Sequence, residues 1–317
     1  MNTPSILEKL SLPIELDVKG ITINEFVEYY NQNDAAIENN LRNVGAIKFK
    51  NVRIGSADDF QSIVDNISSK FLSYIDGNSP RTKLSGNVYT STEYDKSQRI
   101  TMHNELSYSA KWPNKLFFSC IEPATHGGET LLADSRLILD AIPRRIVDLV
   151  LERGVMYIRN LHSGMGMGPS WQDTFETEDK VQLEKYLKNY SIDFEWLSNG
   201  NLRLRHKSKG IIQHRLTHEM VWFNQIDQFH PIQLGEEIYS MMKGMYDSEE
   251  EFPMHVKFGD GSRVGEDMIS EILNCIERVT VAPKWSENEL LIVDNELVSH
   301  GRNPFEGTRR VLVAMSE

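Results

Sequence analysis

Side chains that bind transition metals occur in two short segments of this chain. His103 and Glu105 stand two residues apart, and His300 follows an apolar run close to the C-terminus. On an extended strand, residues two apart project to the same face, so the imidazole of His103 and the carboxylate of Glu105 would lie side by side. Two imidazoles and one carboxylate on one face of a metal ion suit ferrous iron and oxygen chemistry, because open coordination positions remain.

The His-x-Glu pattern is weak evidence when taken alone. A chain with 9 histidines and 46 acidic residues is expected to contain about one such pair by chance. The remaining histidines lack a paired spacing, and we do not expect them to bind a metal; they are His126, His162, His206, His214, His218, His230 and His255.

Two adjacent arginines open the last apolar segment of the chain, after His300 and a turn rich in Gly and Pro. An arginine there could hold the far carboxylate of a chelating 2-oxo acid through bidentate, charge-assisted hydrogen bonds. Strand alternation would place Arg310, Leu312 and Ala314 on one face and Arg309 on the opposite face.

Four sequence blocks in the same order carry a resemblance to a known family. The chain resembles the taurine dioxygenase and clavaminate synthase-like superfamily of iron(II)/2-oxoglutarate oxygenases, and in texture it is most similar to the amino-acid hydroxylases of nonribosomal peptide pathways, such as the syringomycin-type aspartyl hydroxylase. The blocks, which lie within a match from about residue 85 to 317, are HNELSY at 103–108, GGETLLADSR at 127–136, VWFNQ at 221–225 and HGRNPFEGTRR at 300–310.

The resemblance implies the cofactors and the residues that hold them. It implies a site for iron(II) made by His103, Glu105 and His300, with 2-oxoglutarate and O2 as co-substrates. It also implies that Arg310 and Thr130 hold the distal carboxylate of 2-oxoglutarate. From the residues alone, Thr130 could equally be a strand hydroxyl without a role.

Two departures from well-known members of the superfamily bear on the reaction. The carboxylate ligand is Glu105 rather than an aspartate, as in clavaminate synthase-like enzymes, and halogenating relatives lose this ligand altogether. Glu105 therefore favours an oxygen-derived outcome over halogenation. Taurine-type enzymes carry a further arginine four residues after the one that holds 2-oxoglutarate, and here that position is Ala314, which makes taurine a poor candidate.

Four residues are candidates for contact with the substrate. Trp222 and Asn224 follow a predicted strand and would face the same way, although core packing explains Trp222 equally well. A buried amide such as that of Asn224 must find hydrogen-bond partners, which fits the wall of a pocket. Tyr108 and Arg136 are further candidates for the same surface.

Composition excludes several classes of partner. The formal charge of -12 argues against a nucleic-acid partner, which would require clustered cations. The first residues lack the basic and long apolar parts of a secretion signal, and no apolar stretch reaches membrane-spanning length. Cys120 and Cys275 stand in apolar runs rather than in a redox or metal motif. We therefore expect a cytoplasmic protein without a membrane partner.

Short runs with β character dominate the chain after residue 98, and they must position the metal-binding side chains. Their number favours a barrel or jelly roll over a doubly wound sheet. The expected fold is mixed α/β dominated by β, with a double-stranded β-helix core and flanking and inserted helices. We expect one oxygenase domain, in which residues 1–85 give helical and strand support and 86–317 form the core, with helical and lid insertions at about 135–280. The glycine-rich loop at 162–170 fits a gate over a pocket and a plain surface loop equally well.

These observations predict an oxygenase that hydroxylates, or otherwise oxidises, an sp3 C–H bond of a small amino-acid-like substrate, free or carried on a thiolation domain, in natural-product biosynthesis. Desaturation, cyclisation and epoxidation use the same cofactors and remain alternatives. A non-catalytic jelly-roll binding protein and a zinc hydrolase are alternatives of other classes, but neither needs an arginine that anchors an oxo acid.

Overall fold

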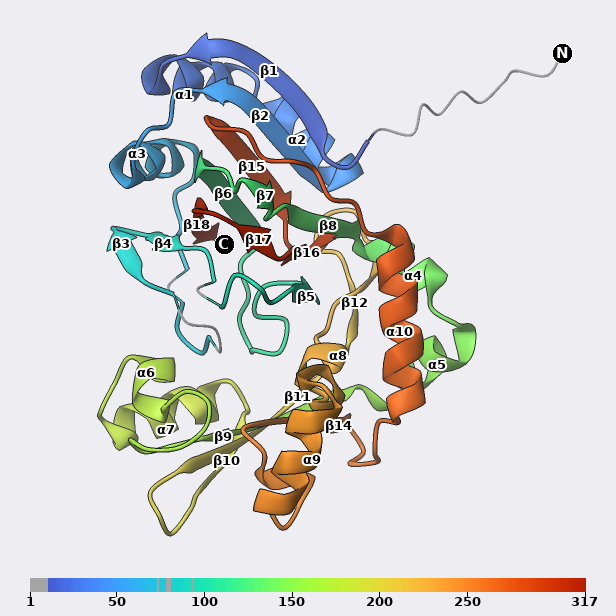
Figure 1. The fold of residues 1–317 in the computed structure, drawn as a ribbon. Helices are drawn as coiled ribbons and strands as arrows, with labels where there is room; N and C mark the ends of the chain where they lie inside the picture. Colours follow the sequence, from blue (N-terminus) through green and yellow to red (C-terminus); the bar gives the residue numbers. More distant parts are fainter. Residues whose placement is uncertain (1–10, 73, 78–80, 93) are drawn as a thin grey trace, which may run out of the picture.

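A seven-stranded sheet is the largest layer of the fold, in the order β1-β2-β15-β6-β18-β4-β3 (Figure 1). The computed structural model describes residues 11–317 apart from 73, 78–80 and 93. Its strands come from both ends of the chain, and they are β1 (Ile14–Ile21), β2 (Ala46–Val52), β3 (Lys83–Ser85), β4 (Val88–Thr90), β6 (Lys115–Glu122), β15 (Glu289–Asp294) and β18 (Arg310–Ser316). The fold is therefore mixed α/β and rich in strands, as the sequence predicts.

A three-stranded sheet, in the order β5-β16-β8, lies against the main sheet. Its strands are β5 (Ile100–His103), β16 (Val298–Arg302) and β8 (Thr130–Asp134), and the short strands β7 (His126–Gly127) and β17 (Phe305–Glu306) pair beside it. The ring of Phe118 on β6 lies 5.3 Å from the ring of His300 on β16. The two sheets thus face each other, and side chains from both line the space between them.

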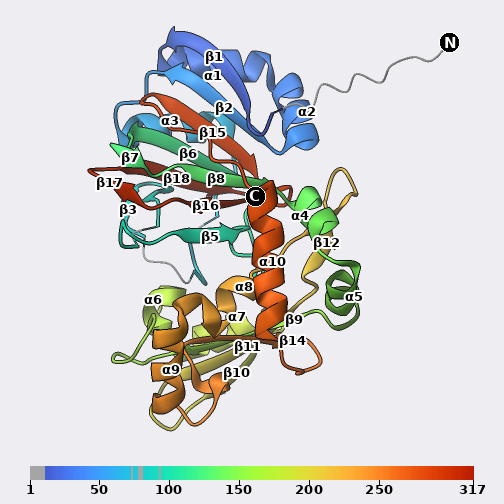
Figure 2. The same cartoon turned by 45° about the vertical axis from the view of Figure 1, so that its right-hand side comes forward.

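Three helices cover the other face of the main sheet (Figures 1 and 2): α1 (Ile23–Gln32), α2 (Asp34–Val44) and α3 (Ala57–Ile67). Thr22 and Glu25 form the capping box that their spacing predicts, and Ser56 caps α3. Phe26, Phe49 and Leu312 belong to one buried cluster that joins these helices to the sheet. The N-terminal segment is therefore packed into the same layers as the C-terminal strands.

The chain between β8 and β15 forms a second, smaller part of the molecule. Its four-stranded sheet has the order β10-β11-β9-β14, built from β9 (Val155–Leu161), β10 (Asp193–Trp196), β11 (Leu202–Ser208) and β14 (Met254–Phe258), and β12 (Ile211–Gln213) pairs with β13 (Met220–Trp222). The helices are α4 (Ser135–Ala141), α5 (Arg144–Arg153), α6 (Trp171–Phe175), α7 (Lys180–Asn189), α8 (Ile226–Phe229), α9 (Glu236–Met245) and α10 (Glu266–Val279), with 3-10 turns η1 (Pro231–Leu234) and η2 (Glu249–Glu251). Both views show α10 running along one side, from the small sheet down to this part (Figures 1 and 2).

Most predicted strands exist, but their membership of sheets differs from a simple barrel. The runs that became β9, β10 and β11 form the separate lower sheet rather than part of the core. The run at 279–283 is not a strand, because Val279 ends α10 and Val281 makes only an isolated bridge to Leu132. The segment expected to hold helices and a lid therefore also contains a sheet of its own.

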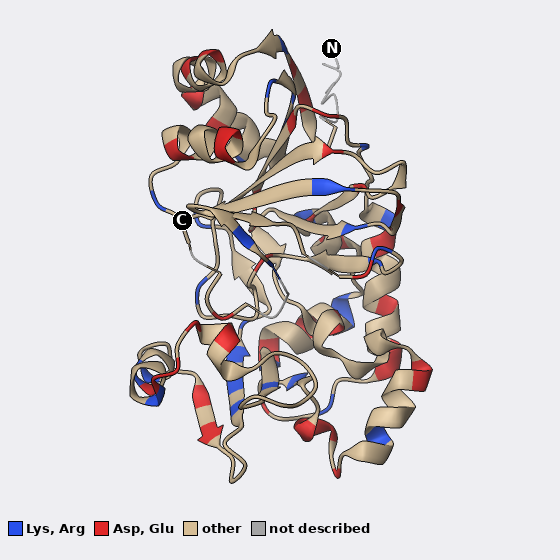
Figure 3. Cartoon of the chain, turned by 60° about the vertical axis from the view of Figure 1, so that its left-hand side comes forward, with Lys and Arg blue, Asp and Glu red and all other residues tan. Residues whose placement is uncertain are grey.

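Charged side chains are spread over the outer helices and loops, whereas the strands of the main sheet carry few (Figure 3). Acidic residues occur on several helices rather than in one patch, consistent with the net charge of -12. Among the helices of the described residues, none has the length and apolar character needed to cross a membrane.

Candidate metal centre and its pocket

Strand pairing brings the two predicted histidines together. His103 is the last residue of β5 and pairs directly with His300 on β16, where the register of the antiparallel ladder shifts. Their ring centroids are 4.3 Å apart. Opposed residues on neighbouring antiparallel strands have side chains on the same face, so one hydrogen-bond register overcomes nearly two hundred residues of sequence separation.

Glu105 reaches the same place by a different route from the one its spacing suggests. β5 ends at His103, so Glu105 lies in the following turn and not on the strand. The side chain of Asn295, in the turn between β15 and β16, holds it there. The Glu105 N–H donates to Oδ1 of Asn295 at 2.7 Å, and Nδ2 of Asn295 donates to the Glu105 carbonyl at 3.0 Å. A buried amide in this turn therefore replaces strand geometry as the device that positions the carboxylate.

Each of His103, Glu105 and His300 offers one ligand atom, and these atoms lie within 4.8 Å of one another; among the described residues no other group of three such side chains does this. Nε2 of His300 lies 3.6 Å from Oε2 of Glu105. Nitrogen and oxygen ligands bind transition metals at about 2.0 to 2.2 Å, so small side-chain rotations would close the cluster on one ion. The residue types and spacing fit a ferrous ion.

The environment keeps both imidazoles in the form that binds metals. Burial lowers the pKa of His103, although Glu105 opposes this effect. Burial, together with His103 and Arg81, lowers the pKa of His300 well below its usual value. Nδ1 of His103 lies 2.9 Å from the carbonyl oxygen of Thr101, which can only accept, so this nitrogen carries the proton and Nε2 is left with a free lone pair.

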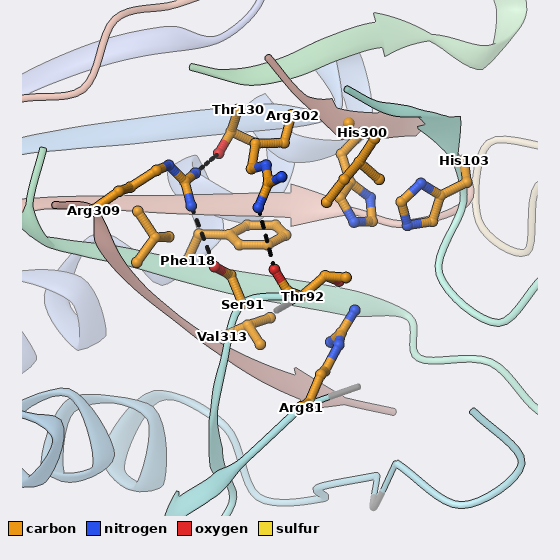
Figure 4. Close-up of a pocket in the computed structure, with 13 residues that line it drawn as sticks. Arg81, Ser91, Thr92, His103, Phe118, Thr130, His300, Arg302, Arg309 and Val313 are labelled. Carbon is orange, nitrogen blue, oxygen red and sulfur yellow. Dashed lines mark hydrogen bonds between the residues drawn. The ribbon is translucent and has the colours of Figure 1, made fainter. Parts of the chain in front are cut away.

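A pocket extends from the histidines between the two sheets and ends at Arg309 and Thr130 (Figure 4). Nη2 of Arg309 donates to Thr130 Oγ1 at 3.4 Å, and Nη1 donates to Ser91 Oγ at 3.2 Å. Nε1 of Trp285 also donates to Thr130 Oγ1, at 2.9 Å. Because this oxygen already accepts two hydrogen bonds, its own hydrogen is available for a ligand in the pocket.

The structure corrects the assignment of the pocket arginine. Arg310 is exposed at the first position of β18 and pairs across the strands with Glu122. Arg309 is the arginine that lines the pocket, with Val311 and Val313 on the same face. The alternation was predicted correctly, but the wrong face was assigned to the interior. Counted from Arg309, the position four residues later is Val313, so the taurine-type arginine is absent there too.

Arg302 closes the pocket at its rim. Its side chain is buried and donates to the carbonyl oxygens of Thr92, Tyr94, Asp95 and Gln98. These bonds hold the segment that runs above the pocket. Burial, with the nearby Arg302, lowers the pKa of Arg309 to about 10, so Arg309 stays charged at neutral pH.

A second cavity opens on the other side of the metal cluster. It reaches His103 and Glu105, and its wall is formed by β5, the turn after it, α8 and the segment that follows α8; the lining side chains include Tyr74, Tyr94, Gln98, Arg99, Tyr108, Gln225, Gln228, Phe229 and Met254. Tyr108, a predicted substrate residue, lies in this wall, and its hydroxyl donates to the Asp76 carbonyl at 3.1 Å.

The other three predicted substrate residues lie outside both cavities. Arg136 is occupied by ion pairs with Asp134 and Glu219. Trp222 is buried in the hydrophobic core around α4 and α8. The amide of Asn224 donates to the Gly210 carbonyl and accepts from the N–H of Ile226. The physical reason is the same for all three, because each side chain satisfies the local packing or polarity of its own element.

Sequence reasoning missed several residues of the two cavities. Arg309 was visible in the double arginine, and Gln225 in the VWFNQ block, where the residue after Asn224 is the one that faces the cavity. Arg81, Ser91 and Tyr74 come from the segment before β5, which has no local pattern that marks it. Only the folded chain shows that this segment reaches the cluster.

This fold and the donor set of the cluster are those of the non-haem oxygenases that use iron(II) and 2-oxoglutarate. The chain belongs to the taurine catabolism dioxygenase TauD, TfdA family, whose model matches residues 7–315. The match extends the resemblance seen in the sequence blocks to the N-terminal segment. The protein is thus a non-haem dioxygenase whose cofactors are iron(II), 2-oxoglutarate and O2.

Two curated relatives cover most of the chain. It is 32% identical over 294 residues to the dapdiamide synthesis protein DdaC of Enterobacter agglomerans, which covers 93% of this chain and 87% of that protein. It is 28% identical over 321 residues to a clavaminate synthase-like protein of Arabidopsis thaliana, covering 98% of this chain and 93% of the other.

Solved structures share the fold at low sequence identity. PvcB of Pseudomonas aeruginosa superposes with a TM-score of 0.53 at 12% identity, covering 95% of this chain and 84% of PvcB. A taurine dioxygenase from Burkholderia xenovorans superposes with a TM-score of 0.50 at 11% identity, covering 95% of this chain and 85% of the other.

Proposed function

We propose that this enzyme hydroxylates an sp3 C–H bond of a small amino-acid-like substrate, with iron(II) held by His103, Glu105 and His300. The observation that carries the proposal is the convergence of these three ligand atoms within 4.8 Å at one end of the pocket that ends at Arg309. When bound, iron(II) with 2-oxoglutarate and O2 supplies an oxidant able to remove hydrogen from an unactivated carbon. The facing sheets around this pocket support assignment of the core as a double-stranded β-helix.

In this proposal Arg309 and Thr130 hold the distal carboxylate of 2-oxoglutarate. A guanidinium donates to a carboxylate through charge-assisted hydrogen bonds, and the Thr130 hydroxyl adds one donor, fixed in direction by Trp285. Phe118, Val311 and other apolar side chains of the pocket keep the site dry, which strengthens these polar contacts. A structural metal site or a hydrolase would not need such an anchor.

Glu105 bears on the outcome of the reaction. Halogenating relatives lack the carboxylate ligand, whereas here Glu105 lies beside both histidines. Hydroxylation therefore fits this site better than halogenation. Desaturation, cyclisation and epoxidation use the same residues and differ in the substrate bound in the second cavity.

The relatives support a role in natural-product biosynthesis. DdaC is named for dapdiamide synthesis, and PvcB is described as an oxygenase from an isonitrile synthetic pathway. The second cavity, lined by glutamines, tyrosines and an arginine, suits a polar amino-acid-like molecule.

Anaerobic addition of iron(II) and 2-oxoglutarate tests the proposal directly. A weak visible charge-transfer band should form in the wild type and be absent in His103→Ala. His126→Ala is the matched control, because His126 is an exposed histidine away from the cluster, and it should keep the band. A wild-type protein without the band would overturn the proposal. A screen for succinate release over free and carrier-tethered amino acids would then identify the substrate.

A further inference from the structure

Arg81 is a buried cation beside the metal cluster that the proposed function leaves without a task. Only 3% of its side chain is exposed, and Nη2 lies 2.6 Å from Oε2 of Glu105. Its guanidinium carbon lies 4.3 Å from the centre of the Tyr74 ring. Figure 4 shows Arg81 approaching the histidines from the side of the pocket opposite Thr130 and Arg302.

Most of the hydrogen-bonding capacity of this guanidinium is unused. Nε and Nη1 of Arg81 are buried and have no hydrogen-bond partner among the described residues. A buried charged donor without a partner is costly, so such a group is normally paired with an anion or a polar ligand. In the described part of the chain, Glu105 is the one carboxylate within 4 Å of Arg81.

Glu105 cannot satisfy Arg81 fully once it serves the metal. A carboxylate bound to a dication shares its single negative charge with that ion. Arg302 and Arg309 line the same pocket, and no carboxylate of the described residues lies within 4 Å of either. With iron(II), a 2-oxoglutarate dianion, Glu105 and the three arginines in place, an excess of about two positive charges remains, which favours a further anion.

The position of Arg81 indicates where that anion lies. Arg81 lines the 2-oxoglutarate pocket and also an outer cavity that it shares with Tyr74, Tyr94 and Met254. These same three side chains line the second cavity, which contains His103 and Glu105. Arg81 therefore stands where the metal cluster meets the space left for the substrate, at the end of the pocket remote from Arg309.

We propose that Arg81 binds a free carboxylate of the substrate next to the metal, and so selects an amino acid with an unblocked carboxyl group. The inference rests on the proposed function and narrows its substrate class. An amino acid carried as a thioester has lost its α-carboxylate, so Arg81 favours a free amino acid, or a side-chain carboxylate where the substrate is tethered. Arg81 is a binding residue here and takes no part in the oxidation itself.

Binding to the anaerobic enzyme with iron(II) and 2-oxoglutarate tests the proposal without turnover. The probes are the proteinogenic amino acids together with carboxamide analogues in which each carboxyl is replaced in turn. Binding is read from the perturbation of the charge-transfer band. At least one acid should bind the wild type, and its amide should bind at least about tenfold more weakly, as expected for loss of a charged hydrogen bond.

Two variants separate charge from structure. Arg81→Met should weaken binding of the acid by about 10- to 100-fold, leave the amide unchanged and leave the dissociation constant of 2-oxoglutarate within about threefold. Arg81→Lys should restore part of the affinity for the acid. An arginine with a purely structural role would weaken the acid and the amide alike.

Three outcomes would overturn the proposal while the band, and hence the proposed function, stays intact. Acid and amide could bind the wild type equally well. Arg81→Met could weaken 2-oxoglutarate instead of the amino acid, which would assign Arg81 to the co-substrate. Finally, no acid of the panel could perturb the wild-type band. Loss of the band from the wild type would instead reject the proposed function itself.

Discussion

Two neighbouring arginines at the start of β18 have opposite surroundings. Arg309 is directed between the sheets with Val311 and Val313, whereas Arg310 is exposed. The next residues are apolar on both faces, because Leu312 and Ala314 pack under the N-terminal helices. A strand buried on both sides has no polar face to show which way is inward, so alternation alone could not choose between the two arginines.

Substitution of each arginine by methionine distinguishes the two positions. Arg309→Met removes charge-assisted hydrogen bonds worth roughly 1.5 to 3 kcal/mol, so the dissociation constant of 2-oxoglutarate should rise by about 10- to 100-fold. Arg310→Met is the matched control and should change it by less than about threefold. Anaerobic titration of the visible band measures both constants. Equal effects of the two substitutions would contradict the reassignment.

Asp227, on α8 behind the second cavity, is a buried carboxyl with an unusual pKa. Burial raises this pKa from 3.8 to about 7, and Oδ2 has no hydrogen-bond partner among the described residues. In the unfolded chain the group ionises near 3.8. Its contribution to stability is therefore greatest below pH 3.8 and is lost as the pH rises through about 7.

Asp227→Asn should remove this dependence on pH. The variant should gain stability relative to the wild type as the pH rises from 4 to 8, by up to roughly 4 kcal/mol for the difference between 3.8 and about 7. Urea unfolding at several pH values measures the difference in free energy. Asp260→Asn, at an exposed site, should show no such upward trend. A constant difference between Asp227→Asn and wild type would refute the expectation.

At the scale of elements, one turn positions the carboxylate of the cluster. Asn295 accepts from the Glu105 N–H and donates to the carbonyls of Glu105 and Pro113, and its own carbonyl accepts from Asn104 at 2.6 Å. The turn between β15 and β16 and the turn after β5 are thereby one hydrogen-bonded unit. The His-x-Glu spacing predicted a strand here, but buried amide bonds do this work.

Asn295→Ala should affect both stability and metal binding. Three side-chain hydrogen bonds are lost and the buried N–H and carbonyl of Glu105 lose partners, which should cost roughly 2 to 4 kcal/mol. Iron(II) affinity should fall by about tenfold or more because Glu105 is no longer held. Urea unfolding and metal titration measure the two effects. Asn189→Ala, at the exposed end of α7, should leave both unchanged; unaltered metal affinity in Asn295→Ala would show that the turn does not position Glu105.

Local patterns predicted the elements better than their partners. The capping box at Thr22 and the strands β6, β8, β15 and β18 follow from propensity and alternation, which act over a few residues. Nothing in those patterns specifies that β9 leaves the core for a separate sheet, or that the segment around Arg81 reaches the cluster. Such contacts depend on long-range pairing, which a single sequence does not encode locally.

At the scale of the whole molecule, Asp76 joins the upper and lower parts. Its buried carboxylate forms an ion pair with Arg159 on β9 of the lower sheet and accepts from Ser109 Oγ at 2.7 Å, in the turn beyond Glu105. The Asp76 carbonyl accepts from Tyr108. We propose, on this basis and from the N-terminal strands in the main sheet, that the chain unfolds as one domain.

Asp76→Asn tests this coupling. The change leaves Arg159 as a buried charge without its counter-ion and should destabilise the protein by roughly 3 to 5 kcal/mol. The double variant Asp76→Asn/Arg159→Met should recover part of this loss, since no buried charge then remains unpaired. Tryptophan fluorescence reports on both parts, because Trp171 and Trp196 lie in the lower part and Trp285 beside the pocket. In a single domain, the fluorescence and circular dichroism transitions should coincide and shift together in Asp76→Asn; if the lower part melted separately while the pocket stayed folded, the two parts would be independent domains.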